Sequence, residues 1–306
     1  MKQRLPSWIR IRFKTDGNHA LVQSAINRHG LHTVCESAHC PNRHECFNRG
    51  TATIMILGNI CTRHCRFCAV ESGKPAPLDR QEPHRAAALV KQLDLRHAVV
   101  TSVTRDDLPD GGASVFAETV REIRSLTRNG TKVEILTPDF NGSEEALNIV
   151  LDALPDVFNH NLETVARLQP LVRPQAGYRR SLGVLRHASA SKQARAVKSG
   201  LMAGMGETDA ELFQAMENLV EAGCELLTVG QYLAPSRNHL PVARFVPPEL
   251  FAEYRQKALG LGFKEVASGP MVRSSYMADS LYQSVFHDRN YAKAQPGHRQ
   301  LRKARC

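Results

Sequence analysis

Short apolar runs rich in β-branched residues alternate with longer segments along most of the chain. In the longer segments the apolar residues recur every three to four positions, as in an amphipathic helix, whereas the short runs are typical of buried strands. Strands are predicted at 51–57, 97–103, 132–137, 157–161, 196–202, 226–232 and near Val266. Helices are predicted at 83–95, 113–127, 143–154, 164–171, 179–187, 208–222 and 247–259.

This alternation predicts an α/β fold with a parallel sheet. Six or seven repeats are enough to curve the sheet into a partial (β/α)6 barrel, closed or nearly closed, with N- and C-terminal extensions. Thr208 and Glu211 match the capping box of one predicted helix, and Pro247 and Pro248 suit the first positions of another. In such barrels the chemistry lies in the loops at the carboxyl ends of the strands.

The composition is that of an ordinary globular protein. Of 306 residues, 42% are hydrophobic and 23% charged, which argues against disorder and against a membrane protein. No apolar run approaches the roughly 18 residues of a membrane span. The N-terminus lacks the apolar stretch of a secretory signal, so we expect a cytoplasmic protein, in which the eight cysteines indicate thiolate chemistry and not disulfides.

The net charge of +10 is concentrated at the two ends of the chain. Residues 1–49 carry +5, the last 20 residues carry another +5, and the stretch between them is neutral. Such a field attracts an acidic protein, a nucleic acid or a membrane surface, and composition does not choose among them. A solvated tail without a partner is an equally good interpretation of residues 287–306.

Six of the eight cysteines fall within residues 35–68, in two triplets. The N-terminal triplet, C-x4-C-x5-C, consists of Cys35, Cys40 and Cys46. The loop triplet, C-x3-C-x2-C, follows the first predicted strand and consists of Cys61, Cys65 and Cys68. Closely spaced thiolates select iron-sulfur clusters or zinc. Structural zinc usually takes four ligands in two CxxC pairs, which neither triplet supplies, whereas three thiolates on a four-iron cluster leave one iron open for another ligand.

The loop triplet, with Phe67 before its last cysteine and a βα barrel around it, resembles the radical S-adenosylmethionine (SAM) superfamily. GLMAGMGE at 200–207 resembles the fifth-strand motif that this superfamily places beside the adenine of SAM. From Pro6 to about Ala278, a series of motifs is similar, in order, to the lipoyl synthase family: CESAHCPNRHEC, LGNICTRHCRFC, TSVTRDDLPDGGA, KSGLMAGMGET, GQYLAPSRNHLPV and SGPMVRSSYMA.

The resemblance implies a TIM-like partial barrel of the radical SAM type, with two 4Fe-4S clusters and SAM as cofactors. The loop triplet would hold the cluster that binds SAM. The N-terminal triplet and Ser275 would hold an auxiliary cluster that gives up sulfur, with Ser274 as the less favoured alternative to Ser275. Three segments follow: 1–50 with the auxiliary-cluster cysteines, 51–270 as the barrel, and 271–306 with the RSSY motif and the basic tail.

Contacts to SAM are expected from three loops. The carboxylate of Asp106 suits the ammonium group of SAM, and Gly111 and Gly112 allow close approach of the backbone. Polar residues after the fourth predicted strand are suited to hydrogen-bond a ribose: Asn159, Asn161 and Glu163. The fifth-strand motif adds Gly200, Met202, Gly204 and Glu207. Ordinary turns and loop hydrogen bonds are the alternative interpretation of these residues.

The implied activity is insertion of two sulfur atoms, at the sixth and eighth carbons of an octanoyl chain bound to a lysine, to form the lipoyl cofactor. These carbons carry no acidic proton, so no catalytic acid or base is assigned. The implied partners are octanoylated carrier domains, of a 2-oxoacid dehydrogenase E2 subunit or the glycine-cleavage H protein, an electron donor such as ferredoxin or flavodoxin, and an iron-sulfur carrier. Neither nucleic acid nor a membrane is expected as a partner.

Two other functions match parts of the pattern. Another sulfur-inserting radical SAM enzyme, such as a biotin synthase or a methylthiotransferase, would carry its second cluster differently, and the serine motif discriminates against it. A metal-stabilised nucleic-acid-binding module would need basic residues interleaved with aromatics, yet aromatics are only 6%. Asn59 and Phe47 depart from the family pattern, where an acidic residue and a tryptophan are common.

Overall fold

The computed structural model describes residues 5–10, 18–128 and 130–286. Its centre is one eight-stranded sheet whose strands lie in chain order from β1 to β8. β2 to β8 are parallel, and β1 pairs antiparallel with β2. The strands are β1 His32–Thr33, β2 Thr53–Ile56, β3 His97–Ser102, β4 Lys132–Leu136, β5 Val157–Asn159, β6 Ala196–Ala203, β7 Leu226–Gln231 and β8 Glu265–Gly269.

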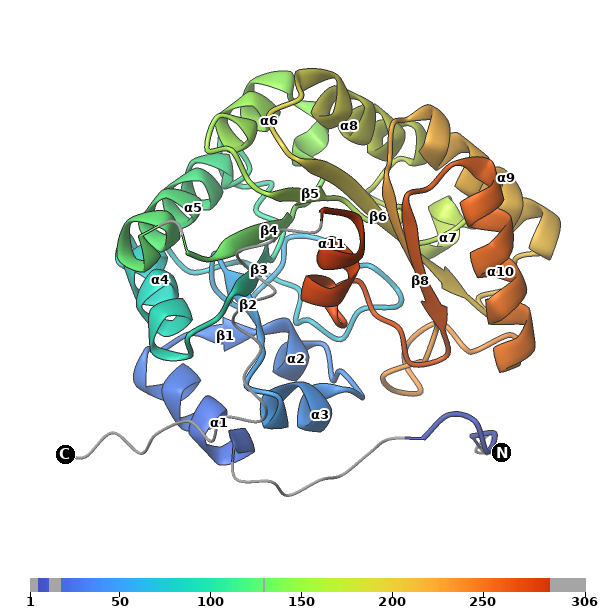
Figure 1. The fold of residues 1–306 in the computed structure, drawn as a ribbon, viewed down its shortest axis with the longest axis horizontal. Coiled ribbons are helices and arrows are strands. Elements are labelled where there is room, and N and C mark those ends of the chain that lie inside the picture. The colour runs from blue at the N-terminus through green and yellow to red at the C-terminus, as the bar shows by residue number, and fades with distance from the viewer. Residues whose placement is uncertain (1–4, 11–17, 129, 287–306) are drawn as a thin grey trace.

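Helices follow β2 to β7 and cover the outside of the curved sheet (Figure 1). They are α4 Glu82–Gln92, α5 Ala113–Thr127, α6 Glu144–Leu151, α7 Gln169–Val172, α8 Tyr178–Ser191, α9 Asp209–Glu221 and α10 Pro248–Leu261, with a short 3-10 turn, η1, at Phe140–Gly142. The six βα units confirm the expected partial barrel, and β8 adds a seventh parallel strand. Among the described residues, β8 pairs with neither β1 nor β2, so the barrel is open.

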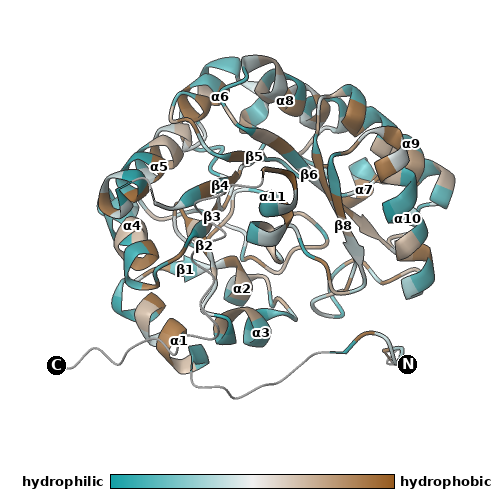
Figure 2. Ribbon diagram, in the orientation of Figure 1, coloured by the Kyte–Doolittle hydropathy of each residue, from teal (hydrophilic) through white to brown (hydrophobic). Residues whose placement is uncertain are grey.

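Burial explains why these segments take these forms. Every residue of β2 and β7 is buried, as in a parallel sheet covered on both faces. On α5, Phe116, Val120 and Ile123 are fully buried at helical spacing, and each such side chain contributes about 1.5–3 kcal/mol to stability. Figure 2 accordingly shows both hydrophobic and hydrophilic turns on the outer helices.

The C-terminal helix, α11 (Ala278–Phe286), lies in the middle of the ring in Figure 1. Its Leu281 and Tyr282 pack against the first residues of β5, β6 and β7, which are Val157, Ala196 and Leu226. The ring of Tyr282 also lies 5.7 Å from that of His97, at the start of β3. This helix therefore fills the end of the barrel opposite to the loops in which chemistry is expected.

The N-terminal extension forms α1 (Asn18–Arg28), α2 (Val34–Ser37), α3 (Arg43–Asn48) and β1 beside the barrel, none of which the sequence pattern predicts. The helix predicted at 164–171 is wrong in its start: residues 166–168 form a turn, and α7 begins only at Gln169, with Pro170 in its first turn. Proline suits that position because its missing N–H is not needed there.

No helix in the described part of the chain is long and apolar enough to span a bilayer. The division at residues 50 and 270 stays a prediction, and the basic tail, 287–306, lies outside the described residues.

Candidate metal and cofactor site

The loop triplet lies on the connection that follows β2. A short parallel bridge holds the loop together, because Cys61 N donates to Glu71 O at 2.8 Å and Gly73 N donates to Cys61 O at 2.9 Å. The Cys61 sulfur accepts a hydrogen bond from Thr104 N at 3.3 Å. Cys65 and Cys68 line a hollow of about 340 Å³ that opens beside this loop.

The three loop cysteines are close enough to influence one another. Burial raises the pKa of Cys68 to about 12, and the charges of Cys65 and Cys61 add to that rise. Burial also raises the pKa of Cys65, although the Arg173 guanidinium, which hydrogen-bonds its sulfur, opposes the rise. Thiolates gathered in this way need a positive centre to balance their charge, and an iron-sulfur cluster provides one.

The N-terminal triplet forms a second group. Cys35 lies on α2, Cys46 lies on α3, and Cys40 lies on the turn between them. Burial raises the pKa of Cys35 to about 11 and that of Cys46 to about 12, and the charge of Cys40 adds to both. No three His, Cys, Asp or Glu side chains of the described residues converge as ligands of a single metal ion. A four-iron cluster makes no such demand, because each thiolate binds a different iron.

Residues 271–276 close the gap between the N-terminal triplet and the barrel, and we refer to their contacts with residues 42–45 as the clasp. Asn42 Nδ2 donates to Met271 O at 2.7 Å, and Tyr276 Oη donates to Glu45 Oε1 at 2.8 Å. Each bond joins groups more than 200 residues apart in the sequence. Burial lowers the pKa of Arg273, and the charge of Cys40 opposes this shift. The RSSY motif is thus placed against the N-terminal triplet.

Ser274 faces the barrel and contacts the polar residues predicted to bind a ribose. Its Oγ accepts from Asn159 Nδ2 at 2.9 Å and donates to Asn161 Oδ1 at 3.0 Å. Asn161 Nδ2 in turn donates to Glu163 Oε1 at 3.1 Å, and the charge of Glu163 reaches both Cys65 and Cys68. The segment 271–276 therefore contacts the N-terminal extension through Asn42 and Glu45 and the residues after β5 through Ser274.

Ser274, Asn159, Asn161 and Glu163 form a row of hydrogen-bonded polar side chains, which we call the polar row. A buried ion pair holds the first asparagine of this row in place. Glu134 Oε1 accepts from Lys198 Nζ at 2.8 Å and from Asn159 Nδ2 at 2.9 Å, and both charged side chains are buried. Although burial alone raises the pKa of Glu134, Lys198 and His97 lower it to about 2. Asn159 Oδ1 is left buried and without a partner among the described residues, so it is available to accept from a hydroxyl group of a ligand.

The fifth-strand motif lies on β6 and the turn after it. A Cβ on Gly200 would lie 2.7 Å from Asn161 Oδ1, so only glycine leaves the polar row undisturbed. Gly204 has a φ of +97°, which favours glycine. Glu207 accepts from Gly204 N at 2.7 Å and Met205 N at 2.9 Å, so it shapes this turn, while Met202 is half-buried on the same strand.

The loop after β3 holds Asp106 in a different environment from the one the sequence suggests. Both Asp106 oxygens accept from Arg63, at 2.7 and 2.8 Å. A ligand ammonium would have to share this carboxylate, and its contact with Asp106 stays a prediction. Gly111 and Gly112 both have positive φ, and a Cβ on Gly112 would overlap Leu57 at the end of β2. Gly112 allows close packing against the start of the loop that carries the cysteines, and Gly111 allows close packing against Phe140 in the loop after β4.

Comparison with known proteins places this site in a family. The model of the radical SAM superfamily matches residues 55–219. A lipoyl synthase of Caldanaerobacter subterraneus subsp. tengcongensis is 52% identical, covering 91% of this chain and 97% of its own. A lipoyl synthase of Pasteurella multocida is 55% identical, covering 90% of this chain and 86% of its own. The chain belongs to the lipoyl synthase family of radical SAM enzymes.

Solved structures with little sequence identity share the fold. Methylornithine synthase (PylB) aligns with a TM-score of 0.52 and 13% identity, covering 94% of this chain and 91% of that one. Streptococcus suis SuiB bound to the precursor peptide SuiA aligns with a TM-score of 0.55 and 11% identity, covering 74% and 50%. These likenesses support the open α/β barrel of the family.

Lipoyl synthases of the radical SAM type imply two 4Fe-4S clusters and SAM, and the described residues fit these groups. Two sets of three thiols without disulfides supply the soft ligands, and the buried, unpartnered Asn159 Oδ1 suits a hydroxyl group of a nucleoside. The resemblance of the cysteine motifs to this family is thereby confirmed at the level of the family, whereas the individual ligand assignments stay predictions.

Sequence reasoning missed the residues that support the cysteines. Arg63 is buried between Asp106 and Asp139, 2.8 Å from the latter, and it fixes the cysteine loop to the next two loops. Asp106 and Asp139 follow neighbouring strands, and this pair of acidic residues could have predicted a basic partner between them. For the buried Arg173 and the pair Glu134–Lys198, no local signal exists, because their partners lie on other loops or on another strand.

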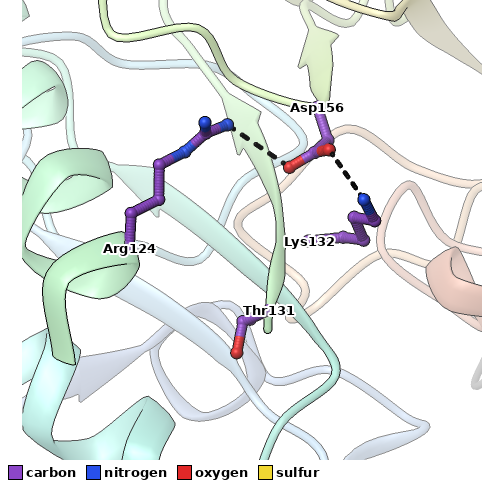
Figure 3. Close-up of a pocket in the computed structure, with 4 residues that line it drawn as sticks. All are labelled: Arg124, Thr131, Lys132 and Asp156. Atoms are coloured by element: carbon purple, nitrogen blue, oxygen red, sulfur yellow. Dashed lines mark hydrogen bonds and ion pairs between the residues drawn. The ribbon is translucent and has the colours of Figure 1, made fainter. Parts of the chain in front are cut away.

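A smaller hollow, of about 150 Å³, lies at the opposite end of the barrel (Figure 3). Asp156, just before β5, pairs there with Arg124 at 3.5 Å and Lys132 at 3.6 Å. These contacts tie α5 to the beginnings of β4 and β5, far from the cysteines, so they stabilise the barrel and take no part in the site.

Proposed function

We propose that the chain inserts two sulfur atoms into the octanoyl-lysine of a lipoyl carrier domain, at the sixth and eighth carbons. The observation that carries this proposal is the position of the RSSY segment. Tyr276 hydrogen-bonds Glu45, the residue before Cys46, at 2.8 Å, and Ser274 hydrogen-bonds Asn159 and Asn161 after β5. A radical source and a sulfur donor bound to these two triplets would face the same space.

When bound, the cofactors supply a radical that removes hydrogen from an unactivated carbon and the sulfur that replaces it. Cys61, Cys65 and Cys68 would hold one cluster. Cys35, Cys40, Cys46 and Ser275 would hold the auxiliary cluster, and the serine oxygen is the poorest match for iron among its four ligands and hence the easiest to lose.

The protein's own residues position these groups and keep water away. Arg63 and Arg173 brace the cysteine loop, and Asn159, Asn161 and Glu163 present polar atoms to the nucleoside of SAM. α11 seals the far end of the barrel with Leu281 and Tyr282, which limits quenching of a radical by solvent.

The proposed carriers are the E2 subunit of a 2-oxoacid dehydrogenase and the glycine-cleavage H protein. The electron donor, of the ferredoxin or flavodoxin kind, the iron-sulfur carrier and the cytoplasmic location stay predictions.

Two cysteine substitutions test whether the loop triplet serves SAM cleavage and the N-terminal triplet serves sulfur donation. Cys65→Ala should abolish formation of deoxyadenosine from SAM. Cys40→Ala should leave it measurable while stopping sulfur insertion, because this thiolate belongs to the proposed donor. Anaerobic assays with an octanoylated peptide distinguish the two variants. Mass spectrometry measures deoxyadenosine and the sulfur-containing product, and the iron and sulfide content of each variant reports which cluster it retains. Cys224→Ala, which removes a buried cysteine outside both triplets, is the matched control. Undiminished lipoyl product from Cys40→Ala would refute the proposal.

A further inference from the structure

The RSSY motif contains three anchored side chains and one that is left open. Arg273 Nη1 donates to Val272 O at 2.6 Å, Ser274 bridges two asparagines, and Tyr276 donates to Glu45. Ser275 is half-buried, and its hydroxyl makes no hydrogen bond to another described residue. The neighbours of Ser275 are therefore fixed on both sides, while its own oxygen is kept available.

The hydrogen bonds of Ser274 have a fixed direction. Lys198 can only donate and ionised Glu134 can only accept, so the Asn159 amide must turn its Nδ2 toward Glu134. The same Nδ2 donates to Ser274, and the serine hydrogen is then left for Asn161 Oδ1. Asn161 consequently directs its Nδ2 to Glu163. One hydroxyl group thus sets the orientation of the amide of Asn161.

We propose that Ser274 is a positioning residue that joins the two halves of the site: it orients Asn161 for SAM and holds Ser275 at the auxiliary cluster. This inference rests on the proposed function, and it adds a role to the serine that the proposed ligand set leaves out. It also gives a physical link between SAM binding and the stability of the auxiliary cluster, since both depend on the same hydroxyl.

Removing this hydroxyl has two consequences. Asn159 Nδ2 and Asn161 Oδ1 lose a partner in a half-buried site, which frees the Asn161 amide to rotate. The backbone at 274 loses its tie to β5, so the neighbouring Ser275 oxygen is held less firmly. A single hydrogen bond of this kind is worth about fivefold in an equilibrium constant.

The test compares Ser274→Ala with the wild type under anaerobic conditions. We expect the dissociation constant of SAM, measured by equilibrium dialysis on the cluster-loaded protein, to rise about fivefold. Release of iron to a ferrous chelator should accelerate about as much, when measured in the Cys65→Ala background so that the iron counted belongs to the N-terminal triplet. Ser274→Thr, which keeps the hydroxyl, should restore both quantities toward the wild-type values.

Two further variants separate this inference from the proposed function. Ser275→Ala should accelerate iron release without changing SAM affinity, and a wild-type release rate in that variant would remove Ser275 from the proposed ligand set. Ser280→Ala, an exposed serine on α11, should change neither quantity. A wild-type value of either quantity in Ser274→Ala overturns the positioning role, whatever Ser275→Ala does.

Discussion

At the scale of single residues, the site depends on groups whose protonation is set by burial. His160 follows β5 and is buried, with its Nδ1 2.9 Å from Thr137 O and its Nε2 2.9 Å from Ser181 Oγ. A carbonyl can only accept, so Nδ1 carries the proton and Nε2 accepts from the serine. Burial, assisted by the charge of Arg173, lowers the pKa of His160 to about 4. The neutral ring holds the backbone between the two predicted ribose-binding asparagines.

This histidine should make stability depend on pH. Its folded pKa of about 4 lies below the ordinary value of about 6.5, so the unfolded chain binds more protons between these values. The stabilisation is present above pH 6.5 and is lost as the pH falls to 4, a change of about 3 kcal/mol. His160→Gln can make both hydrogen bonds without titrating, so its urea-unfolding free energy should fall less over this range. Parallel pH profiles of the two proteins would contradict this account.

At the scale of the element, α9 shows how local sequence shapes the loop before it. Thr208 Oγ1 accepts from Glu211 N at 3.2 Å, and Glu211 Oε2 accepts from Thr208 N at 2.9 Å, which confirms the predicted capping box. Glu211 also accepts twice from Arg167, at 2.6 and 2.9 Å. The helix therefore begins at a defined point directly after the Gly204–Glu207 turn.

Thr208→Ala should lower the free energy of unfolding by about 1 kcal/mol, the usual cost of losing an N-cap side chain. Thr208→Ser keeps the hydroxyl and should recover most of the loss. Thr127 is the last residue of a different helix, α5, and has no N-cap role. The free energy of unfolding of Thr127→Ala should therefore stay within about 0.5 kcal/mol of the wild-type value. Chemical denaturation of the three variants measures this, and equal losses at Thr208 and Thr127 would argue against the cap.

At the scale of the whole molecule, the barrel is open between β8 and β1. Contacts between segments that are distant in the sequence bridge this opening. α11 fills the end of the barrel where the strands begin, and the clasp joins residues 42–45 to 271–276. Asn42 is buried in the clasp, so its loss also leaves the carbonyl of Met271 without a donor. The auxiliary-cluster cysteines thus depend on a contact with the far end of the chain.

Asn42→Ala should lower stability by about 1–3 kcal/mol, the cost of an unsatisfied buried group, and should make residues 34–48 more sensitive to limited proteolysis. Asn218→Ala removes a comparable hydrogen bond, to Tyr178 Oη at 3.0 Å, away from the clasp. Asn218→Ala should lower the free energy of unfolding without making residues 34–48 more sensitive to the protease. Identical cleavage patterns for the two variants would show that the clasp does not secure the N-terminal extension.

Much of this architecture follows from local pattern. The strands β2 to β8 were predictable as short apolar runs, and most helices were predictable from apolar residues that recur every three to four positions. The spacing of Cys61, Cys65 and Cys68 identified the cysteine loop, since three thiolates on one short loop have few other uses. The start of α7 and the whole of α1–α3 were not predictable, because their short segments carry too few periods to show a pattern.

The sequence by itself therefore determined the class of fold, the two cysteine triplets and the family. Only the tertiary structure decided that Ser274 faces Asn159 and Asn161 while Ser275 stays open, that Arg63 occupies Asp106, and that Arg173 meets Cys65. Each of these contacts joins strands or loops that are distant in sequence, and its geometry depends on how the sheet curves and how the C-terminal segment enters it. A local pattern records which side chains are buried, but it does not record which distant partner each of them meets.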